Sequence, residues 1–233
     1  MPADPSVRVI EVFASLQGEG PRLGERQIFV RFGGCNLHCD YCDEPDTIPL
    51  GSGELRSLLD VQRTISGLVE KSKSRSVSWT GGEPLIQKAF LRSALPWARE
   101  AGLSNYLETN GTHPAALREL EPHCDTIAMD IKLPSSTGRD LWAVHREFLA
   151  VAPPKTFVKV ILTSKSADAE WARVVDLVGS VSPDIPLVLQ PVTEAPGVAG
   201  VARETALRFL SLARERLRDV RLIPQWHPVW GLP

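Results

Sequence analysis

Short, almost continuous apolar runs alternate with segments of helical periodicity along nearly the whole chain. Strands that are apolar throughout and separated by helices are typical of βα units and of a parallel sheet that is covered on both faces. The expected strands are 7–13, 28–32, 76–79, 106–108, 126–131, 157–162, 187–189 and 220–223. The expected helices are 60–73, the segment after Pro84 to residue 100, 115–120, 141–149, 167–178 and 202–217. Because 233 residues are few for a closed eight-fold barrel, we predict an α/β fold, an incomplete (βα)6-type partial barrel with some helices shortened.

Local signals set the expected boundaries. Asp60 has a side chain preferred at a helix N-cap, and Pro96 is expected to disturb the helix that contains it. No repeat or low-complexity tract divides the chain, so we expect a single domain. The domain would span residues 1–233. It would include a loose tail at 1–6, an irregular cysteine-containing loop at 33–53 and an aromatic C-terminal tail at 224–233.

The composition argues against several classes of protein. A net charge of −2 and an isoelectric point near 6.2 are unlike a nucleic-acid-binding protein, which usually carries a basic face. No apolar run approaches the ~20 residues of a membrane helix, and the N-terminus lacks the pattern of a signal peptide. Three of the four cysteines are clustered, which does not suggest a disulfide framework. We therefore expect a cytoplasmic protein that binds no membrane and no nucleic acid, with the isolated Cys124 in its core.

The clustered cysteines, Cys35, Cys39 and Cys42, have the spacing C-x3-C-x2-C. Three close thiolates on an irregular loop can hold three irons of a [4Fe–4S] cluster and leave the fourth iron open to an outside molecule, unlike a four-cysteine cluster. Zinc is an alternative, because His38 would supply the fourth ligand that a zinc site requires. Reactive free thiols are a third interpretation.

Polar residues follow four of the expected strands, at Thr80–Pro84, Glu108–Thr112, Asp130–Lys132 and Gln190–Pro191. The carboxyl ends of parallel strands meet at one edge of a sheet, so these segments are expected to face one ligand. Each has a simpler interpretation by itself, such as a tight strand-to-helix turn, an Asn-Gly turn or an ion pair between neighbouring charges. Four polar strand ends in one sheet favour a shared pocket.

Three features indicate the kind of ligand. They are the turn Gln17–Gly20, Arg31, and a tail with Gln225 and His227. An arginine pairs bidentately with a carboxylate, and glutamate and glutamine can bind the amide and amine edge of a heterocycle. Together they suit an acidic, nitrogen-rich ring. A solvated turn, a strand arginine that reaches solvent and a surface imidazole are the alternatives.

These motifs resemble a known family. The cysteine spacing, Tyr41 before the last cysteine and the turn Gly81–Pro84 are similar to the radical S-adenosylmethionine (SAM) superfamily. Over nearly its whole length the chain resembles the 7-carboxy-7-deazaguanine synthases within that superfamily. The segments that carry this resemblance, in the family's order, are SLQGEG, RFGGCNLxCxYCD, TGGEP, ETNGT, DIK, LQP and the tail IPQWH.

The resemblance implies a radical SAM lyase that converts 6-carboxy-5,6,7,8-tetrahydropterin to 7-carboxy-7-deazaguanine with loss of ammonia, in 7-deazapurine and queuosine biosynthesis. It implies a [4Fe–4S] cluster, SAM and Mg2+ as cofactors. A 5′-deoxyadenosyl radical would remove hydrogen from C6 of the substrate, and the hydrogen would be returned, so that SAM acts as a true cofactor. A flavodoxin-like or other electron donor and a second copy in a homodimer are the implied protein partners.

The resemblance also implies roles for individual residues. The cluster ligands would be Cys35, Cys39 and Cys42. Contacts to SAM would come from Tyr41, Asp43, Gly82, Glu83, Asn110, Lys132 and Gln190. Contacts to the substrate would come from Leu16, Gln17, Gly18, Glu19, Arg31, Thr80 and the terminal Pro233. The family often has a threonine that helps to bind Mg2+ where this chain has Glu44; a carboxylate is a suitable ligand, but it adds a negative charge near the substrate carboxylate.

Two other functions are compatible with the cysteine loop. A radical activase, which generates a glycyl radical in a partner protein, shares the cysteine spacing but does not need the Gln17–Gly20 turn or Arg31. A non-catalytic zinc or iron–sulfur module would leave the polar strand ends without a role. Metal analysis and an anaerobic SAM-cleavage assay distinguish the three functions.

Overall fold

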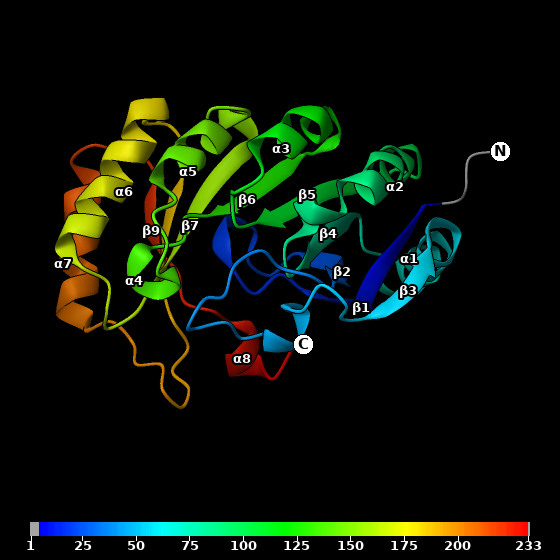
Figure 1. Ribbon diagram of the computed structural model, residues 1–233, viewed down its shortest axis with the longest axis horizontal. Helices are drawn as coiled ribbons and strands as arrows, with labels where there is room; N and C mark the ends of the chain where they lie inside the picture. Colours follow the sequence, from blue (N-terminus) through cyan, green and yellow to red (C-terminus); the bar gives the residue numbers. More distant parts are fainter. Residues whose placement is uncertain (1–4, 233) are drawn as a thin grey trace.

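The computed structural model describes residues 5–232, which form one curved sheet of nine strands that does not close into a barrel (Figure 1). The strands are β1 (Ser6–Leu16), β2 (Arg26–Phe32), β3 (Glu54–Ser57), β4 (Ser76–Gly81), β5 (Ser104–Thr109), β6 (Thr126–Asp130), β7 (Thr156–Leu162), β8 (Leu187–Pro191) and β9 (Val220–Leu222). Their order is β3-β1-β2-β4-β5-β6-β7-β8-β9. From β2 to β9 neighbouring strands are parallel, whereas β1 runs antiparallel to both β2 and β3.

Six helices connect the successive parallel strands. They are α1 (Leu58–Ser72), α2 (Lys88–Glu100), α3 (Pro114–Leu120), α5 (Trp142–Leu149), α6 (Asp168–Val181) and α7 (Arg203–Arg214). Two short helices, α4 (Pro134–Thr137) and α8 (His227–Trp230), lie outside this series. The alternation confirms the predicted six βα units, and α3 and α5, with 7 and 8 residues, are shortened helices of the kind expected.

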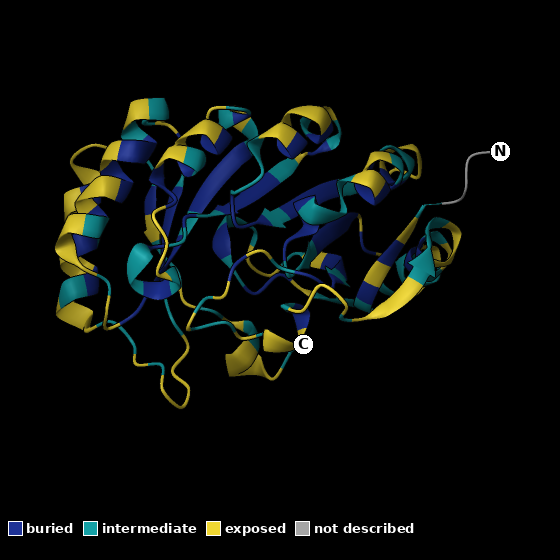
Figure 2. Cartoon of the chain, viewed as in Figure 1, coloured by how far each residue is buried: buried dark blue, intermediate teal, exposed yellow. Residues whose placement is uncertain are grey.

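The main core lies between the sheet and these six helices, all on one face of the sheet. Residues of α1 (Ile65), α2 (Phe90), α5 (Phe148) and α7 (Phe209) belong to one continuous cluster of buried side chains. In Figure 2 the helices are buried toward the sheet and exposed on their outer sides. The strands are apolar throughout because their other, concave face is also covered, there by loops and the C-terminal tail (Figure 1).

Several predicted boundaries need correction. The N-cap of α1 is Ser57 rather than Asp60, because the Ser57 hydroxyl accepts a hydrogen bond from the Asp60 N–H at 3.2 Å. The proline at 96 does not end α2, whose apolar side is buried in the core on both sides of it. Ser6, which was predicted to belong to the loose tail, is the first residue of β1 and pairs with Ser57.

Strand β3 was not predicted from the sequence. It has four residues, two of them exposed, and pairs only with β1 at the edge of the sheet, so it lacks the apolar run that identified the other strands. The prediction for Cys124 is confirmed, since its side chain is buried in the core. Within residues 5–232 no helix is long and apolar enough to cross a membrane.

Candidate active site

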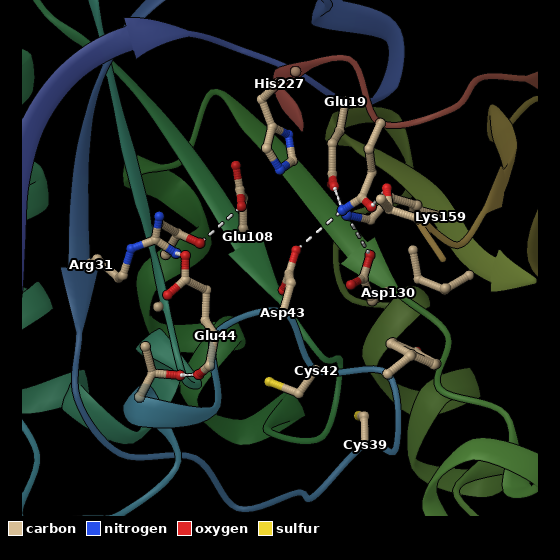
Figure 3. Close-up of a pocket in the computed structure, with 18 of the residues that line it drawn as sticks. Glu19, Arg31, Cys39, Cys42, Asp43, Glu44, Glu108, Asp130, Lys159 and His227 are labelled. Carbon is tan, nitrogen blue, oxygen red and sulfur yellow. Dashed lines mark hydrogen bonds and ion pairs between the residues drawn. The ribbon is translucent and has the colours of Figure 1, made fainter. Parts of the chain in front are cut away.

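A cavity of about 690 Å³ lies at the carboxyl ends of the parallel strands, on the concave side of the sheet (Figure 3). Its wall is built from the ends of β4, β5 and β6, from the loop after β2, from the turn after β1 and from the C-terminal tail. A cavity of this size suits a small-molecule ligand. Strand ends far apart in the chain converge here, as expected from the parallel order of the sheet.

The three clustered cysteines lie side by side on one part of this wall, and none is in a disulfide. Burial raises the pKa of all three thiols above the ordinary value. Two N–H groups point at the Cys35 sulfur, the Leu37 amide at 3.5 Å and the Asn110 side chain at 4.0 Å. Such donors favour a thiolate, the form that binds iron, and therefore fit a cluster ligand.

The arrangement differs from a site for one metal ion. In residues 5–232 no group of three or more His, Cys, Asp or Glu side chains is placed to hold a metal ion. A [4Fe–4S] cluster takes one thiolate per iron, so its three protein ligands need to border one space rather than meet at one point. The three thiols meet that weaker requirement, because all of them line the same cavity.

The turn after β4 packs directly against the cysteine loop. The Glu83 amide donates to the Gly34 carbonyl at 2.8 Å, and a Cβ on Gly82 would lie 2.1 Å from that same carbonyl oxygen. Position 82 therefore accepts only glycine without a shift of the backbone. The absence of a side chain leaves backbone at the cavity wall, where a ligand can approach closely.

Glu83 itself is fully buried and does not line the cavity. Its carboxylate accepts hydrogen bonds from the Leu85 amide, the Thr109 hydroxyl and the Asn110 amide at 2.7–3.0 Å. Burial raises the pKa of Glu83 to about 7, although these donors oppose the shift. Glu83 thus ties the turn after β4 to the end of β5.

Asp130 and Lys132, at the end of β6, form a pair with 2.7 Å between the carboxylate and the ammonium. The Lys132 ammonium also lies 5.4 Å above the centre of the Tyr41 ring. Burial opposes the charge of Lys132, but the Asp130 carboxylate outweighs it and keeps the pKa of Lys132 well above its ordinary value. A positive charge is thereby fixed beside the cysteine loop.

Glu19 is the centre of a further charged group, which Lys159 connects to Asp130 (Figure 3). The Lys159 ammonium contacts its carboxylate, and the Gln190 and Gln225 side-chain amides donate to it at 2.8 and 2.7 Å. Burial would raise the pKa of Glu19, but Lys159 and the two amides hold that pKa at about 2. Glu19 is therefore ionised throughout the neutral range.

Arg31 lies across the cavity from Glu19 (Figure 3). Its guanidinium donates to Glu11 at 2.8 Å and forms an ion pair with Glu44, with 2.9 Å between Nη1 and the carboxylate; it also lies over the Phe13 ring. Phe13 stacks on Phe29 with 5.2 Å between the ring centres, which makes an aromatic wall beside the guanidinium.

Glu108 at the end of β5 lies at the back of the cavity. It accepts hydrogen bonds from the Gln17 side-chain amide and from the Ser78 and Thr80 hydroxyls, at 2.8–3.0 Å. Gln17 and Thr80 were predicted substrate contacts, and this carboxylate orients both. The turn after β1 and the end of β4 are thereby held to one strand end.

The C-terminal tail crosses the cavity mouth and docks on the turn after β1. The Trp226 amide donates to the Gly18 carbonyl at 2.9 Å, and a Cβ on Gly18 would lie 2.6 Å from the His227 ring. The Gln225 amide reaches Asp43 at 3.2 Å. The predicted contact at Pro233 lies outside the described residues.

Most predicted site residues come together in this cavity. Those that line it are Leu16, Gln17, Gly18, Glu19, Arg31, Cys35, Cys39, Tyr41, Cys42, Asp43, Glu44, Thr80, Gly82, Asn110 and Lys132. Glu83 and Gln190 do not; both are fully buried behind it, so they reach the cavity only through the groups that they hold.

Sequence reasoning missed Phe13, Phe29 and Lys159 as members of the site. Glu108, Asp130, Gln225 and His227 belong to segments that the sequence indicated, but no individual contact was predicted for them. Lys159 could have been identified from the sequence, because it is the one charged residue in the apolar strand TFVKVIL. No sequence signal indicated that Phe13 and Phe29 line the cavity, since an aromatic residue in a strand is ordinarily a core residue.

Comparison with known proteins agrees with the site. The Radical SAM superfamily profile matches residues 29–171, more than half of the chain. The 7-carboxy-7-deazaguanine synthase of Geobacter sulfurreducens is 41% identical, over 97% of this chain and 98% of the relative. The synthase of Methanothermobacter thermautotrophicus is 32% identical, over 96% and 97%.

Solved structures support the fold. QueE from Escherichia coli superposes with a TM-score of 0.68 at 24% identity, over 95% of both chains. A radical SAM methyltransferase from Sphaerobacter thermophilus gives a TM-score of 0.66 at 14% identity, over 92% of this chain and 77% of that one. The partial barrel is thus shared with distant radical SAM proteins, whereas the full-length sequence similarity is to the synthases. The chain therefore belongs to the radical SAM superfamily and, within it, to the 7-carboxy-7-deazaguanine synthase family.

Proposed function

We propose that the chain converts 6-carboxy-5,6,7,8-tetrahydropterin to 7-carboxy-7-deazaguanine with release of ammonia, as a step of 7-deazapurine biosynthesis that leads to queuosine. The observation that carries this proposal is one cavity that joins the three-cysteine loop to two opposed charges, the Arg31 guanidinium and the Glu19 carboxylate. The substrate needs such a pair, because it carries a carboxylate at one end and N–H donors at the other. The names of the relatives support the same reaction.

Cys35, Cys39 and Cys42 would hold a [4Fe–4S] cluster, which together with bound SAM would supply the radical chemistry for removal of a hydrogen atom from the substrate. The protein orients SAM and excludes water. Gly82 offers backbone without a side chain, and the fixed Lys132 charge suits a carboxylate of SAM. Tyr41, Asp43 and Asn110 are assigned to the same ligand from the cavity wall. Glu83 and Gln190 act as positioning residues behind it.

The substrate would lie between Arg31 and Glu19. Arg31 binds its carboxylate, and Glu19, always ionised, accepts hydrogen bonds from ring N–H groups. Gln17 and Thr80, both oriented by Glu108, face the ring between these ends. The backbone at Leu16 and Gly18 and the carboxylate of Pro233 are assigned to the same ring edge.

Mg2+ is assigned to Glu44, whose carboxylate is at the cavity wall close to Arg31. Mg2+ is commonly held by one or two carboxylates and completes its shell with waters and substrate oxygens. A single protein carboxylate beside the substrate carboxylate fits this mode of Mg2+ coordination. The metal would offset the repulsion between the two negative charges.

The remaining proposals concern the whole chain. Residues 1–233 are assigned to one radical SAM domain, located in the cytoplasm, where the thiols stay reduced. An external electron donor, such as a flavodoxin, supplies the electron for SAM cleavage. Trp226, Val229 and Trp230 are exposed on the tail, and their apolar surface supports a homodimer.

The test is anaerobic incubation of the reconstituted, reduced protein with the carboxytetrahydropterin and SAM, followed by product analysis. Reconstituted protein should carry about four irons and four sulfides. Alanine at Cys35, Cys39 or Cys42 should abolish turnover in a folded chain, whereas Cys124→Ala should keep both cluster and activity. Stoichiometric zinc without iron, or SAM cleavage that never yields the deazaguanine, would contradict the proposal; the second result would favour the activase function.

A further inference from the structure

Arg31, to which the proposed function assigns the substrate carboxylate, already contacts two carboxylates. Glu11 accepts a hydrogen bond from Nε at 2.8 Å, and Glu44 forms an ion pair with Nη1 at 2.9 Å. The side chain of Arg31 is 14% exposed, whereas both glutamate side chains are partly open to solvent. One positive charge is thus surrounded by two negative charges before any substrate carboxylate is considered.

The geometry of a guanidinium limits what a third carboxylate can do. A carboxylate binds bidentately along an edge that presents two parallel N–H groups, and arginine has two such edges, one that includes Nε and one that includes Nη1. Glu11 accepts a hydrogen bond at the first edge, and the Glu44 carboxylate lies against Nη1 of the second. A bidentate pair with a substrate carboxylate therefore requires one of the two glutamates to leave.

The two glutamates are not equivalent. Glu11 is on β1, directly paired with Arg31 of β2, and is not part of the cavity wall. Glu44 comes from the loop after the cysteines and lines the cavity. The Nη1 edge therefore faces the ligand, and Glu44 is the partner that can move without disturbing a strand pair.

We propose that Glu44 occupies the donor edge of Arg31 that the substrate carboxylate takes, so that substrate binds by exchange of one carboxylate for another. This inference rests on the proposed function. Before binding, Glu44 holds the guanidinium in place. After turnover the product still carries a carboxylate, and the return of Glu44 to Arg31 displaces it. Glu44 thus weakens ground-state binding of carboxylated pterins and favours product release.

The test is equilibrium binding of 6-carboxypterin, an oxidised pterin without a hydrogen on C6 to be removed, to unreduced reconstituted protein with SAM and without divalent cations. Glu44→Gln keeps the size of the side chain and removes its charge. It should bind 6-carboxypterin about tenfold more tightly than the wild type, because the competitor is gone. Affinity for the uncharged 6-hydroxymethylpterin should not change.

Glu11→Gln is the matched control. It removes the other carboxylate from the same guanidinium, but from outside the cavity, so it should not tighten binding of 6-carboxypterin. In an Arg31→Ala background the effect of Glu44→Gln should vanish. Thermal unfolding confirms that each variant is folded, and Glu44→Ala repeats the test without any side-chain acceptor.

The exchange is overturned if Glu44→Gln binds 6-carboxypterin no more tightly than the wild type, or if Glu11→Gln tightens it equally. Failure of the exchange alone leaves the wild type able to form the deazaguanine. If the proposed function is wrong, a different result is expected: neither the wild type nor any variant binds either pterin, and no product forms.

Discussion

At the scale of single residues, buried charges hold the site together. Lys159 lies between Glu19 and Asp130, and all three side chains are less than one fifth exposed. An ion pair with so little solvent stabilises little by itself, but removal of one member leaves an uncompensated buried charge. This is why a strand lysine that looks incidental in the sequence matters for the fold as well as for the cavity.

Lys159→Met should therefore lower the free energy of unfolding by about 3–5 kcal/mol, because Glu19 loses its counter-charge and Asp130 keeps only Lys132. Denaturant unfolding measures the change. Lys165→Met is the control, since the Lys165–Asp40 pair is exposed and should cost at most about 1 kcal/mol. Equal losses in the two variants would contradict the assignment.

His145 gives a prediction on pH. It is fully buried, and its Nε2 lies 3.1 Å from the Asn110 carbonyl oxygen, so the neutral ring can donate to it. Burial lowers the pKa of His145 from 6.5 to about 4. Between these values the unfolded chain binds a proton that the folded chain does not. Its contribution to stability is therefore complete above pH 6.5 and is lost as the pH falls toward 4, by on the order of 3 kcal/mol.

His145→Gln keeps a donor but does not titrate, so unfolding free energies measured from pH 7.5 to 4 should fall less steeply than in the wild type. Glu83 titrates in the same range with the opposite sign, because its pKa is raised to about 7, but it is present in both proteins and cancels in the difference. Parallel pH profiles would show that His145 does not carry the effect.

At the scale of elements, the site depends on the close approach of the turn after β4 to the loop after β2. Sequence reasoning identified both segments and their order, because glycine-rich turns and cysteine spacing are local features. It did not show that the two touch, which follows from the pairing of Phe32 with Gly81 in neighbouring parallel strands.

Gly82→Ala should push the turn away from the Gly34 carbonyl, with a cost of about 1–3 kcal/mol in stability and a lower iron content after reconstitution. Gly67→Ala is the matched control in α1, where an added Cβ meets nothing within 4 Å. It should stabilise the protein by about 0.5–1 kcal/mol and leave iron binding unchanged. Normal iron content in Gly82→Ala would show that the contact is not needed for the cluster.

At the scale of the whole molecule, the two ends of the sequence close one cavity. The turn at Gly18 and the tail at Trp226 are joined by a backbone hydrogen bond, and Gln225 reaches both Glu19 and Asp43. The tail is thereby tied down, unlike an ordinary terminus. We propose that the carboxylate of Pro233 binds the ring N–H groups of the substrate, and this proposal can be tested at the end of the tail.

Deletion of Pro233, or extension by one glycine, should move that carboxylate while the docked part of the tail remains. We expect a raised KM for the pterin, equivalent to roughly 1.5–3 kcal/mol for a charge-assisted hydrogen bond, with SAM binding and thermal stability nearly unchanged. Steady-state kinetics of the two variants test this. Wild-type kinetics in both would leave the tail with a structural role only.

The sequence by itself determined what is local. Apolar runs, helical periodicity and turn residues identified the six βα units, and the cysteine spacing and polar strand ends identified most of the cavity wall, because these properties are encoded within a few neighbouring residues. Only the tertiary structure decided which side chains meet. Glu19 contacts Lys159, Gln190 and Gln225 from 140, 171 and 206 residues away, and Glu44 pairs with Arg31 through the fold of an irregular loop. Such pairs depend on strand order and on how the loops pack over the sheet, and no local pattern records either.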